Sequence, residues 1–325
     1  MSSEELARLW GREMVARLEK IAAAVFARYD VDFSCARRAG GYTNAVWLAG
    51  GLVLRLSVRP GNDKIRREAR LAALLPPEVG YPTLVETGET DGHEWSLARE
   101  IAGHNLGESW QGLDWSERGS ALRQLWKKTQ AVHDMDCAVL SGLVGERAWF
   151  NSNDLVEAGA RLARVAQEGI LDTHQADTLR EALGRHARAL AGARRVLNHG
   201  DLTPDNCIWQ NGRLVSLIDF EWAVLAPAEL DWNGLVKWAL GPDEHSPLEP
   251  VVLELAGPVL DGAGARDRLL GYAILLELHM LNDWLDHPEG EGPMETWAPY
   301  RRLRSLADGA GGYLAPLMAS PRPPF

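Results

Sequence analysis

Residues 199–206, HGDLTPDN, and residues 218–221, IDFE, decide the fold class expected for this chain. They place an aspartate at Asp201, an asparagine five residues later at Asn206, and a second aspartate thirteen residues beyond that, at Asp219. An Asn-Gly pair between the two segments is typical of a tight hairpin turn, which would bring the second segment back beside the first. The order and spacing therefore predict three oxygen-bearing side chains around one cavity.

Each of these side chains suits one part of a phosphoryl transfer. Asp201 is predicted to accept a hydrogen bond from an acceptor hydroxyl and to take its proton. Asn206 and Asp219 offer the hard oxygen ligands that Mg2+ requires. The alternative is that the first segment is merely a turn and that Asp219 caps a strand. The presence of both segments at this spacing favours the chemical interpretation.

Protein kinases carry their catalytic base and two magnesium ligands in the same order, as H-R-D-x-x-x-x-N followed by D-F-G. Here Gly200 replaces the Arg and Glu221 replaces the last Gly, a variant that resembles the aminoglycoside phosphotransferase and choline kinase group of small-molecule kinases. The resemblance extends over about residues 35–235. It implies an α+β, protein-kinase-like two-lobe fold, with a small β-rich N-lobe that holds one inserted helix and a larger, mainly helical C-lobe.

The hydrophobic pattern agrees with two lobes. Residues 1–101 are expected to form the N-lobe, with an N-terminal helix, a five-stranded antiparallel sheet and a nucleotide loop, and residues 102–325 to form the C-lobe, with the catalytic loop and the acceptor site. The expected helices span residues 3–29, 64–75, 116–134, 155–167, 176–190 and 265–285, and the expected strands span residues 33–38, 45–49, 52–58, 83–88 and 94–101. The tail from residue 307 is rich in Gly, Ala and Pro, so we expect it to be loosely ordered.

Composition limits the classes of function. The chain has 325 residues, of which 46% are hydrophobic and 24% charged, and a formal net charge of −11. This acidity argues against nucleic acid as a partner. It is compatible with a cationic substrate, although acidity also serves solubility alone. Three widely spaced cysteines indicate neither a zinc site nor a disulfide framework, and no stretch resembles a signal peptide or a membrane span. We therefore expect a cytoplasmic protein that binds neither nucleic acid nor membrane.

Residues 40–44, GGYTN, join two expected strands. A Gly-Gly pair between strands is usually only a turn. At this place, however, the segment resembles the phosphate-covering loop of the phosphotransferase group. The resemblance implies that backbone amides around Gly41, helped by Thr43 and Asn44, cradle phosphate oxygens.

Arg55 stands where kinases carry the Lys of V-A-I-K. Arg keeps the positive charge but presents a wider, planar fork, so it can still hold phosphate oxygens. The resemblance implies that Arg55 pairs with Glu68 on the following helix. The alternative for Glu68 is a solvated helix charge, and Lys64 is a rival cation for the phosphates.

Residues 99–103, REIAG, resemble the hinge between the lobes of a kinase. The resemblance implies that backbone groups of this segment, including those of Glu100 and Ala102, meet the purine edge. Backbone contacts carry little side-chain signature, so ATP is the expected nucleotide and GTP stays an alternative.

Four carboxylates of the helical lobe are candidates for binding the acceptor: Glu221, Asp231, Glu277 and Asp283. Glu277 interrupts an apolar run, so it either faces a wet cleft or is a costly buried charge. For Asp231 the resemblance also implies support of the catalytic loop, and Asp283 equally suits an ordinary surface charge. Together they favour a cationic or amino-sugar-like acceptor.

These features predict a kinase that uses Mg2+ to transfer the γ-phosphoryl group of ATP, or GTP, to a hydroxyl of an antibiotic or a similar polar metabolite, with antibiotic resistance as the expected role. One alternative is a metabolite kinase of the choline, homoserine or sugar type. Another is a catalytically weak, nucleotide-binding protein of the kinase fold, for which Arg55 is the only support. A protein kinase is disfavoured because no A-P-E element follows Asp219.

Overall fold

The computed structural model describes residues 10–40, 43–140, 142–150, 154–241, 246–288, 292–309 and 311–319. In this part of the chain the N-terminal region is built on a five-stranded antiparallel sheet. The strands lie in the order β1 (Arg37–Ala39), β2 (Asn44–Ala49), β3 (Leu52–Ser57), β5 (His93–Arg99) and β4 (Leu84–Thr90). The sheet agrees with the expected α+β class.

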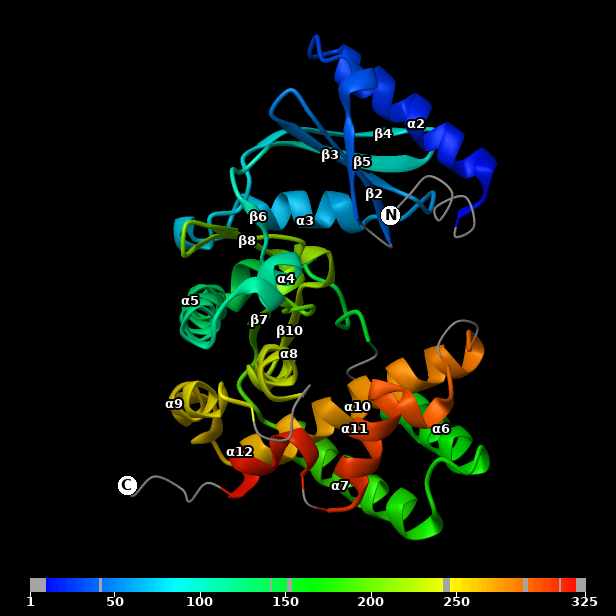
Figure 1. Ribbon diagram of the computed structural model, residues 1–325, viewed down its shortest axis with the longest axis vertical. Coiled ribbons are helices and arrows are strands. Elements are labelled where there is room, and N and C mark those ends of the chain that lie inside the picture. The colour runs from blue at the N-terminus through cyan, green and yellow to red at the C-terminus, as the bar shows by residue number, and fades with distance from the viewer. Residues whose placement is uncertain are drawn as a thin grey trace.

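Different helices cover the two faces of this sheet (Figure 1). α2 (Arg12–Ala27) packs its apolar side, including Phe26, against Leu54 and Leu56 of β3. Side chains alternate along a strand, so Arg55 points to the opposite face. On that side α3 (Lys64–Ala72) lies between the sheet and the helical region (Figure 1), which brings its residue Glu68 to Arg55.

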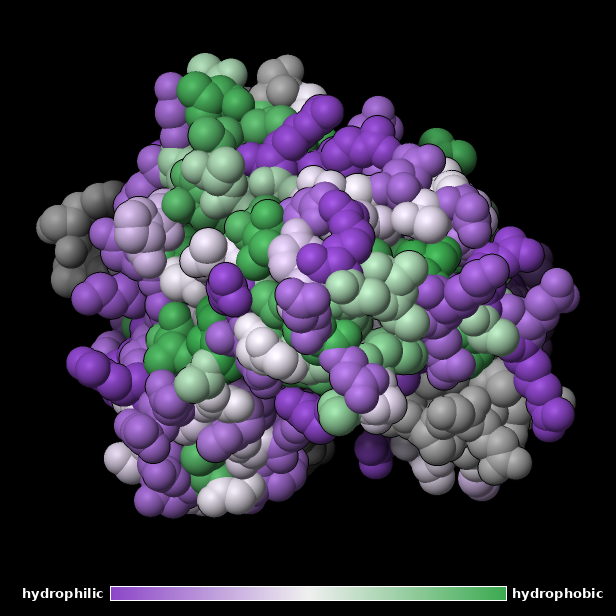
Figure 2. All heavy atoms as spheres, turned by 90° about the horizontal axis from the view of Figure 1, so that it is seen from above, coloured by the Kyte–Doolittle hydropathy of each residue, from purple (hydrophilic) through white to green (hydrophobic). Residues whose placement is uncertain are grey.

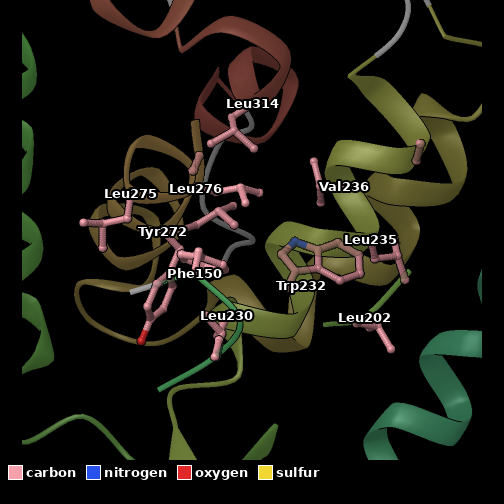
Figure 3. Close-up of a cluster of buried hydrophobic side chains, with 14 of the residues drawn as sticks. Phe150, Leu202, Leu230, Trp232, Leu235, Val236, Tyr272, Leu275, Leu276 and Leu314 are labelled. Atoms are coloured by element: carbon pink, nitrogen blue, oxygen red, sulfur yellow. The ribbon is translucent and has the colours of Figure 1, made fainter. Parts of the chain in front are cut away.

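The C-terminal region is mainly helical (Figure 1). Its described helices are α4 (Leu106–Ser109), α5 (Trp115–His133), α6 (Leu155–Gln167), α7 (Thr173–Leu190), α8 (Glu229–Leu240), α9 (Glu249–Leu260), α10 (Ala265–Asp286), α11 (Ala298–Ala307) and α12 (Ala315–Ala319). Buried side chains of α8, such as Trp232, meet those of α10, such as Leu276, in one continuous core (Figure 3). The segments at residues 199–206 and 218–221 pack against this core.

Short strands connect the two regions. β6 (His104–Asn105) pairs with β8 (Cys207–Gln210), which pairs with β9 (Arg213–Leu217); β7 (Val196–Asn198) pairs with β10 (Val224–Ala226). Residues 199–206 therefore leave β7 and enter β8, and residues 218–221 follow β9. The link between β5 and β6 contains the expected lobe boundary at residues 101 and 102, which stays a prediction.

Most of the strongly periodic segments form the expected helices, and the Asn211-Gly212 hairpin joins β8 to β9. The strand expected at residues 33–38 was wrong in its first half. Phe33–Cys35 is a 3-10 helix because Asp32 accepts a hydrogen bond from the Ser34 amide and caps it. The loosely ordered tail was also wrong for residues 311–319, where Leu314 and Leu317 are fully buried.

Figure 2 views the molecule from the end that carries the five-stranded sheet. On this face hydrophilic residues are widespread, and apolar residues lie among them. None of the helices in the described part of the chain is both long and apolar enough to cross a membrane.

The buried His186 of α7 predicts a pH-dependent stability. Its ring packs against Tyr272, and burial lowers its pKa to about 4, while the nearby charges of Asp267 and Arg268 oppose each other. In the unfolded chain this histidine has a pKa of about 6.5. Its contribution to the free energy of unfolding is therefore complete above that pH and is lost progressively as the pH falls toward about 4. Between about pH 7 and pH 5 we expect a loss of about 2 kcal/mol from this group.

Urea denaturation at the two pH values checks this expectation. His186→Gln should reduce the pH-dependent loss by about that amount, whereas His174→Gln, at an exposed position of the same helix, should leave it unchanged. An equal pH dependence in wild type and His186→Gln would contradict the assignment.

Candidate active site

The segment between β7 and β8 places Asp201 and Asn206 side by side. The Asn206 side-chain amide donates to the Asp201 carbonyl oxygen at 2.8 Å and to its carboxylate at 3.1 Å. The Ile218 amide donates to the Asn206 carbonyl oxygen at 2.9 Å, which brings the residue before Asp219 to the same place. The pKa of Asp201 is raised to about 6, mainly because burial desolvates the carboxylate, and Asp219 adds to this rise. The structure therefore brings the three predicted residues together.

Asp231, in the first turn of α8, binds the backbone of the segment at residues 199–206. One carboxylate oxygen accepts the His199 amide at 2.8 Å and the other accepts the Gly200 amide at 3.0 Å. His133 lies 3.1 Å from the first oxygen, and Asp231 itself is only 2% exposed. His199 in turn contacts the Ile218 carbonyl oxygen through its ring at 2.8 Å. Asp231 is thus occupied by the loop.

Arg55 lies against the second motif, residues 218–221. It donates to Glu68 at 2.5 Å and to Asp219 at 2.7 Å, and it lies 3.5 Å from Glu221. Burial alone would lower the pKa of Arg55, but the three carboxylates together raise it well above its usual value. The expected pairing of Arg55 with Glu68 is therefore observed, and it belongs to a larger buried network.

Glu68 is 3% exposed and is held by two further donors. The hydroxyl of Tyr81 donates to it at 2.7 Å and the amide of Phe220 at 2.9 Å. The solvated helix charge is therefore not what the structure shows. Tyr81 had no sequence signal, because it lies in a loop outside every motif.

Glu221 connects the second motif to the loop expected to cover phosphates. Thr43 donates to one of its oxygens at 2.9 Å and Asn44 to the other at 2.6 Å. Gly41 lies outside the described residues. Lys64, the rival cation, lies with its ammonium 2.9 Å from the centroid of the Trp222 ring, and burial lowers its pKa. The contacts of Thr43 and Asn44 therefore hold the end of the expected loop against residues 218–221.

The expected hinge follows β5, an inner strand of the sheet. The Glu100 amide donates to the Gly51 carbonyl oxygen at 2.9 Å, and its carboxylate lies 3.7 Å from Arg37. Ala102 is exposed in the link that leads to β6. The expected contact of this link with the purine stays a prediction.

A cavity lies beside Asp201 on the helical side. Its walls come from the catalytic loop, α8, α10 and the loop before α6, and they include Trp149, Phe150, Leu202, Leu230, Asn233, Lys237, Trp238 and Leu276. Of the four carboxylates expected to bind the acceptor, only Asp231 lines this cavity. Glu277 is fully buried and forms a two-pronged ion pair with Arg302, at 2.7 and 2.9 Å. Asp283 is 62% exposed and lies 3.8 Å from His287.

The described residues contain no group of three or more His, Cys, Asp or Glu side chains that could hold a metal ion. Asn206 lies outside that set of residue types. The Oδ1 of Asn206 and the Oδ2 of Asp219 accept no hydrogen bond from the described residues. One amide oxygen and one carboxylate oxygen are therefore available as metal ligands. This pair suits a hard cation such as Mg2+.

Comparison with known proteins agrees with this geometry. The model of the phosphotransferase enzyme family matches residues 34–269. The chain belongs to this phosphotransferase family. The resemblance seen in the two motifs is thereby confirmed. A search of curated proteins found no match.

Solved phosphotransferase structures share the fold. The GDP complex of an aminoglycoside 2'-phosphotransferase-IIIa is 17% identical, with a TM-score of 0.66, over 91% of this chain and 98% of the other. The GDP and kanamycin complex of APH(2")-IIia is 18% identical, with a TM-score of 0.65, over 89% of this chain and 97% of the other. A choline/ethanolamine kinase family protein from Mesorhizobium loti is 20% identical, with a TM-score of 0.60, over 94% of this chain and all of the other. The protein-kinase-like fold is therefore confirmed.

Gly200 is predicted to be essential for the conformation of the segment at residues 199–206. Its φ of +82° is in the left-handed region, and a Cβ there would lie 2.0 Å from the Trp222 carbonyl oxygen. We expect Gly200→Ala to lower the free energy of unfolding by about 2 kcal/mol or more. Gly159→Ala, at an open and exposed position of α6, should instead raise it by up to about 1 kcal/mol. Urea denaturation measures both, and a Gly200→Ala protein as stable as wild type would refute the expectation.

Proposed function

We propose that this phosphotransferase transfers the γ-phosphoryl group of ATP or GTP to a hydroxyl of a small molecule. The observation that carries the proposal is the meeting of Asp201, Asn206 and Asp219, with Asp201 lining a cavity of the helical region. The nucleotide complexes among its structural neighbours support it.

Asp201 is proposed as the catalytic residue. It lines the cavity, so an acceptor hydroxyl placed there can donate a hydrogen bond to its carboxylate and pass its proton to it during transfer. The Asn206 amide holds the carboxylate in place. The brace from Asp231 keeps the loop in one conformation, so the hydroxyl meets a preorganised base.

Asn206 and Asp219 are the residues that would hold Mg2+, through the two oxygens that remain free. The ion would neutralise charge on the phosphate oxygens of the nucleotide. On the chain itself, Arg55 supplies a fixed positive charge beside Asp219. The side chains of Thr43 and Asn44 hold the end of the expected phosphate loop against Glu221, and we propose that backbone amides of this loop bind phosphate oxygens.

Glu100 and Ala102 are proposed to offer backbone groups to the purine, as part of the link between the regions. The neighbours that hold GDP keep GTP open beside ATP. We place the reaction in the cytoplasm, where nucleoside triphosphates are available.

An antibiotic is one candidate acceptor, with resistance as the role, because one neighbour is a complex with kanamycin. The choline/ethanolamine kinase family neighbour supports a metabolite instead. A catalytically weak nucleotide-binding protein is a second candidate function. Its support is Arg55, which stands at the usual Lys position and is already bound by three carboxylates.

The transfer proposal predicts that Asp201→Asn abolishes turnover. The amide keeps the size of the side chain but cannot accept the proton, so we expect transfer to fall by about 100-fold or more while nucleotide affinity stays close to wild type. Asp205→Asn, at an exposed site in the same loop, is the matched control and should remain active. The measurement is mass spectrometry of hydroxylated antibiotics and metabolites after incubation with ATP or GTP and Mg2+. Near-normal transfer by Asp201→Asn would remove Asp201 from this role, and nucleotide binding without any transfer by wild type would favour the binding protein.

The metal assignment predicts that Asp219→Ala loses the magnesium dependence of nucleotide binding. Calorimetric titration of wild type should show affinity that drops when EDTA removes Mg2+, because an ion held by Asp219 and Asn206 would neutralise the phosphate charge. In the variant we expect Mg2+-nucleotide affinity to be weaker by about tenfold or more and EDTA to have little further effect. Unchanged affinity with an intact magnesium response would show that Asp219 is not a ligand.

A further inference from the structure

The cavity beside Asp201 contains a cation that no sequence motif indicated. Lys237 of α8 lines this cavity of about 50 Å3, and together with Trp238 it also lines a second hollow of about 160 Å3, whose other walls are Gly241 and Arg302. The two hollows adjoin at Lys237 and Trp238. An acceptor with its hydroxyl at Asp201 would therefore extend toward an ammonium group.

The charge of Lys237 is not neutralised by a direct partner. Within the described part of the chain Lys237 has no hydrogen bond and no ion pair. Burial lowers its pKa and Arg302 adds to this, while the charges of Glu277 and Asp201 oppose it. Glu277 is already engaged by both prongs of Arg302, so it forms no direct pair with Lys237. An anion beside the ammonium would compensate the desolvation of Lys237.

Neither acidic side chain of the cavity forms an ion pair with Lys237 in the described part of the chain, although the charge of Asp201 acts to raise the Lys237 pKa. Asp231 gives both carboxylate oxygens to the catalytic loop and to His133. Asp201 is held by Asn206 and is the proposed base. Asn233, on the same wall, accepts a hydrogen bond from Tyr313 at 3.1 Å. A cationic acceptor would thus find one carboxylate, which it needs for chemistry, and one unpaired ammonium that repels it.

The remaining walls are apolar and partly aromatic. Trp149, Phe150 and Trp238 face the cavity together with Leu202, Leu230 and Leu276. Figure 3 shows Phe150, Leu230 and Leu276 in the packed layer between α8 and α10. Trp149 is held edge-on by His279, at a ring separation of 5.1 Å, and His279 contacts Arg161 at 2.8 Å. Such walls suit an apolar or aromatic body rather than a hydrated polycation.

We infer that the acceptor is a hydroxylated small molecule with an apolar or aromatic body and an oxyanion, a carboxylate or a phosphate ester, which Lys237 binds. The inference rests on the proposed function, since it names the class of acceptor for the same site. It replaces the cationic acceptor expected from the four carboxylates.

Three probes with one skeleton test the charge preference: mandelate, which is an anion, mandelamide, which is neutral, and phenylethanolamine, which is a cation. Phenyl phosphate provides the phosphate arm. Ligand-observed NMR titration of the full chain should show that wild type binds mandelate or phenyl phosphate about tenfold or more tightly than mandelamide, and phenylethanolamine most weakly. The tighter of the two anions identifies the oxyanion.

Lys237→Gln should remove the preference and Lys237→Arg should keep it, because only the positive charge is required. Lys127→Gln, at an exposed site of α5, is the matched control and should bind like wild type. Circular dichroism checks that the variants are folded. Equal binding of mandelate and mandelamide by wild type, including no binding of either, overturns the inference without any variant, and so does an unchanged preference in a folded Lys237→Gln protein.

A transfer assay on the same compounds separates this inference from the proposed function. Phosphorylation of phenylethanolamine in preference to mandelate would overturn the acidic acceptor and leave the phosphotransferase standing. An intact preference for anions in binding, with no phosphoryl transfer to any hydroxylated compound, would overturn the proposed transfer and support the anion site.

Discussion

The guanidinium of Arg55 connects the sheet to the segment that carries Asp219. A buried guanidinium costs several kcal/mol unless carboxylates surround it. Glu68 and Asp219 provide that surrounding at 2.5 and 2.7 Å, and Glu221 lies just beyond them. The position of the sheet relative to the segment at residues 218–221 is therefore set by charge pairing at defined distances. Apolar packing alone would tolerate sliding between the two regions, whereas a network of this kind does not.

The conformation of residues 199–206 depends on a second carboxylate, contributed by the helical region. Asp231 begins α8 and accepts two consecutive backbone amides of the loop, at 2.8 and 3.0 Å. Gly200 permits this conformation of the loop because it has no Cβ. Its φ lies in the left-handed region, and a Cβ there would clash with the Trp222 carbonyl oxygen. Glu221, where protein kinases have Gly, adds a tie to Thr43 and Asn44 that a glycine could not make. The two motifs and the expected phosphate loop thus form one connected polar unit.

Much of the fold could be predicted from local patterns. The helix at residues 155–167 and the β8–β9 hairpin were recognisable because amphipathic spacing and an Asn-Gly turn act over a few residues. α8 escaped prediction because it is buried on nearly all sides, so its residues show no polar face. The tail around residues 311–319 escaped because its Gly and Ala content is typical of loops, while its order comes from burial of Leu314 and Leu317.

The sequence by itself determined the family, the order of the reacting groups and the identity of Asp201, Asn206 and Asp219 as candidates, because a short loop and a hairpin impose their spacing locally. The tertiary structure decided which charges remain available to a ligand. Glu277 and Asp231 found partners in Arg302 and the catalytic loop, which come from distant parts of the chain. Among the described residues, Lys237 was left without an ion pair at the wall of the cavity. Charge pairing between remote segments depends on how helices pack, and no local pattern contains that information.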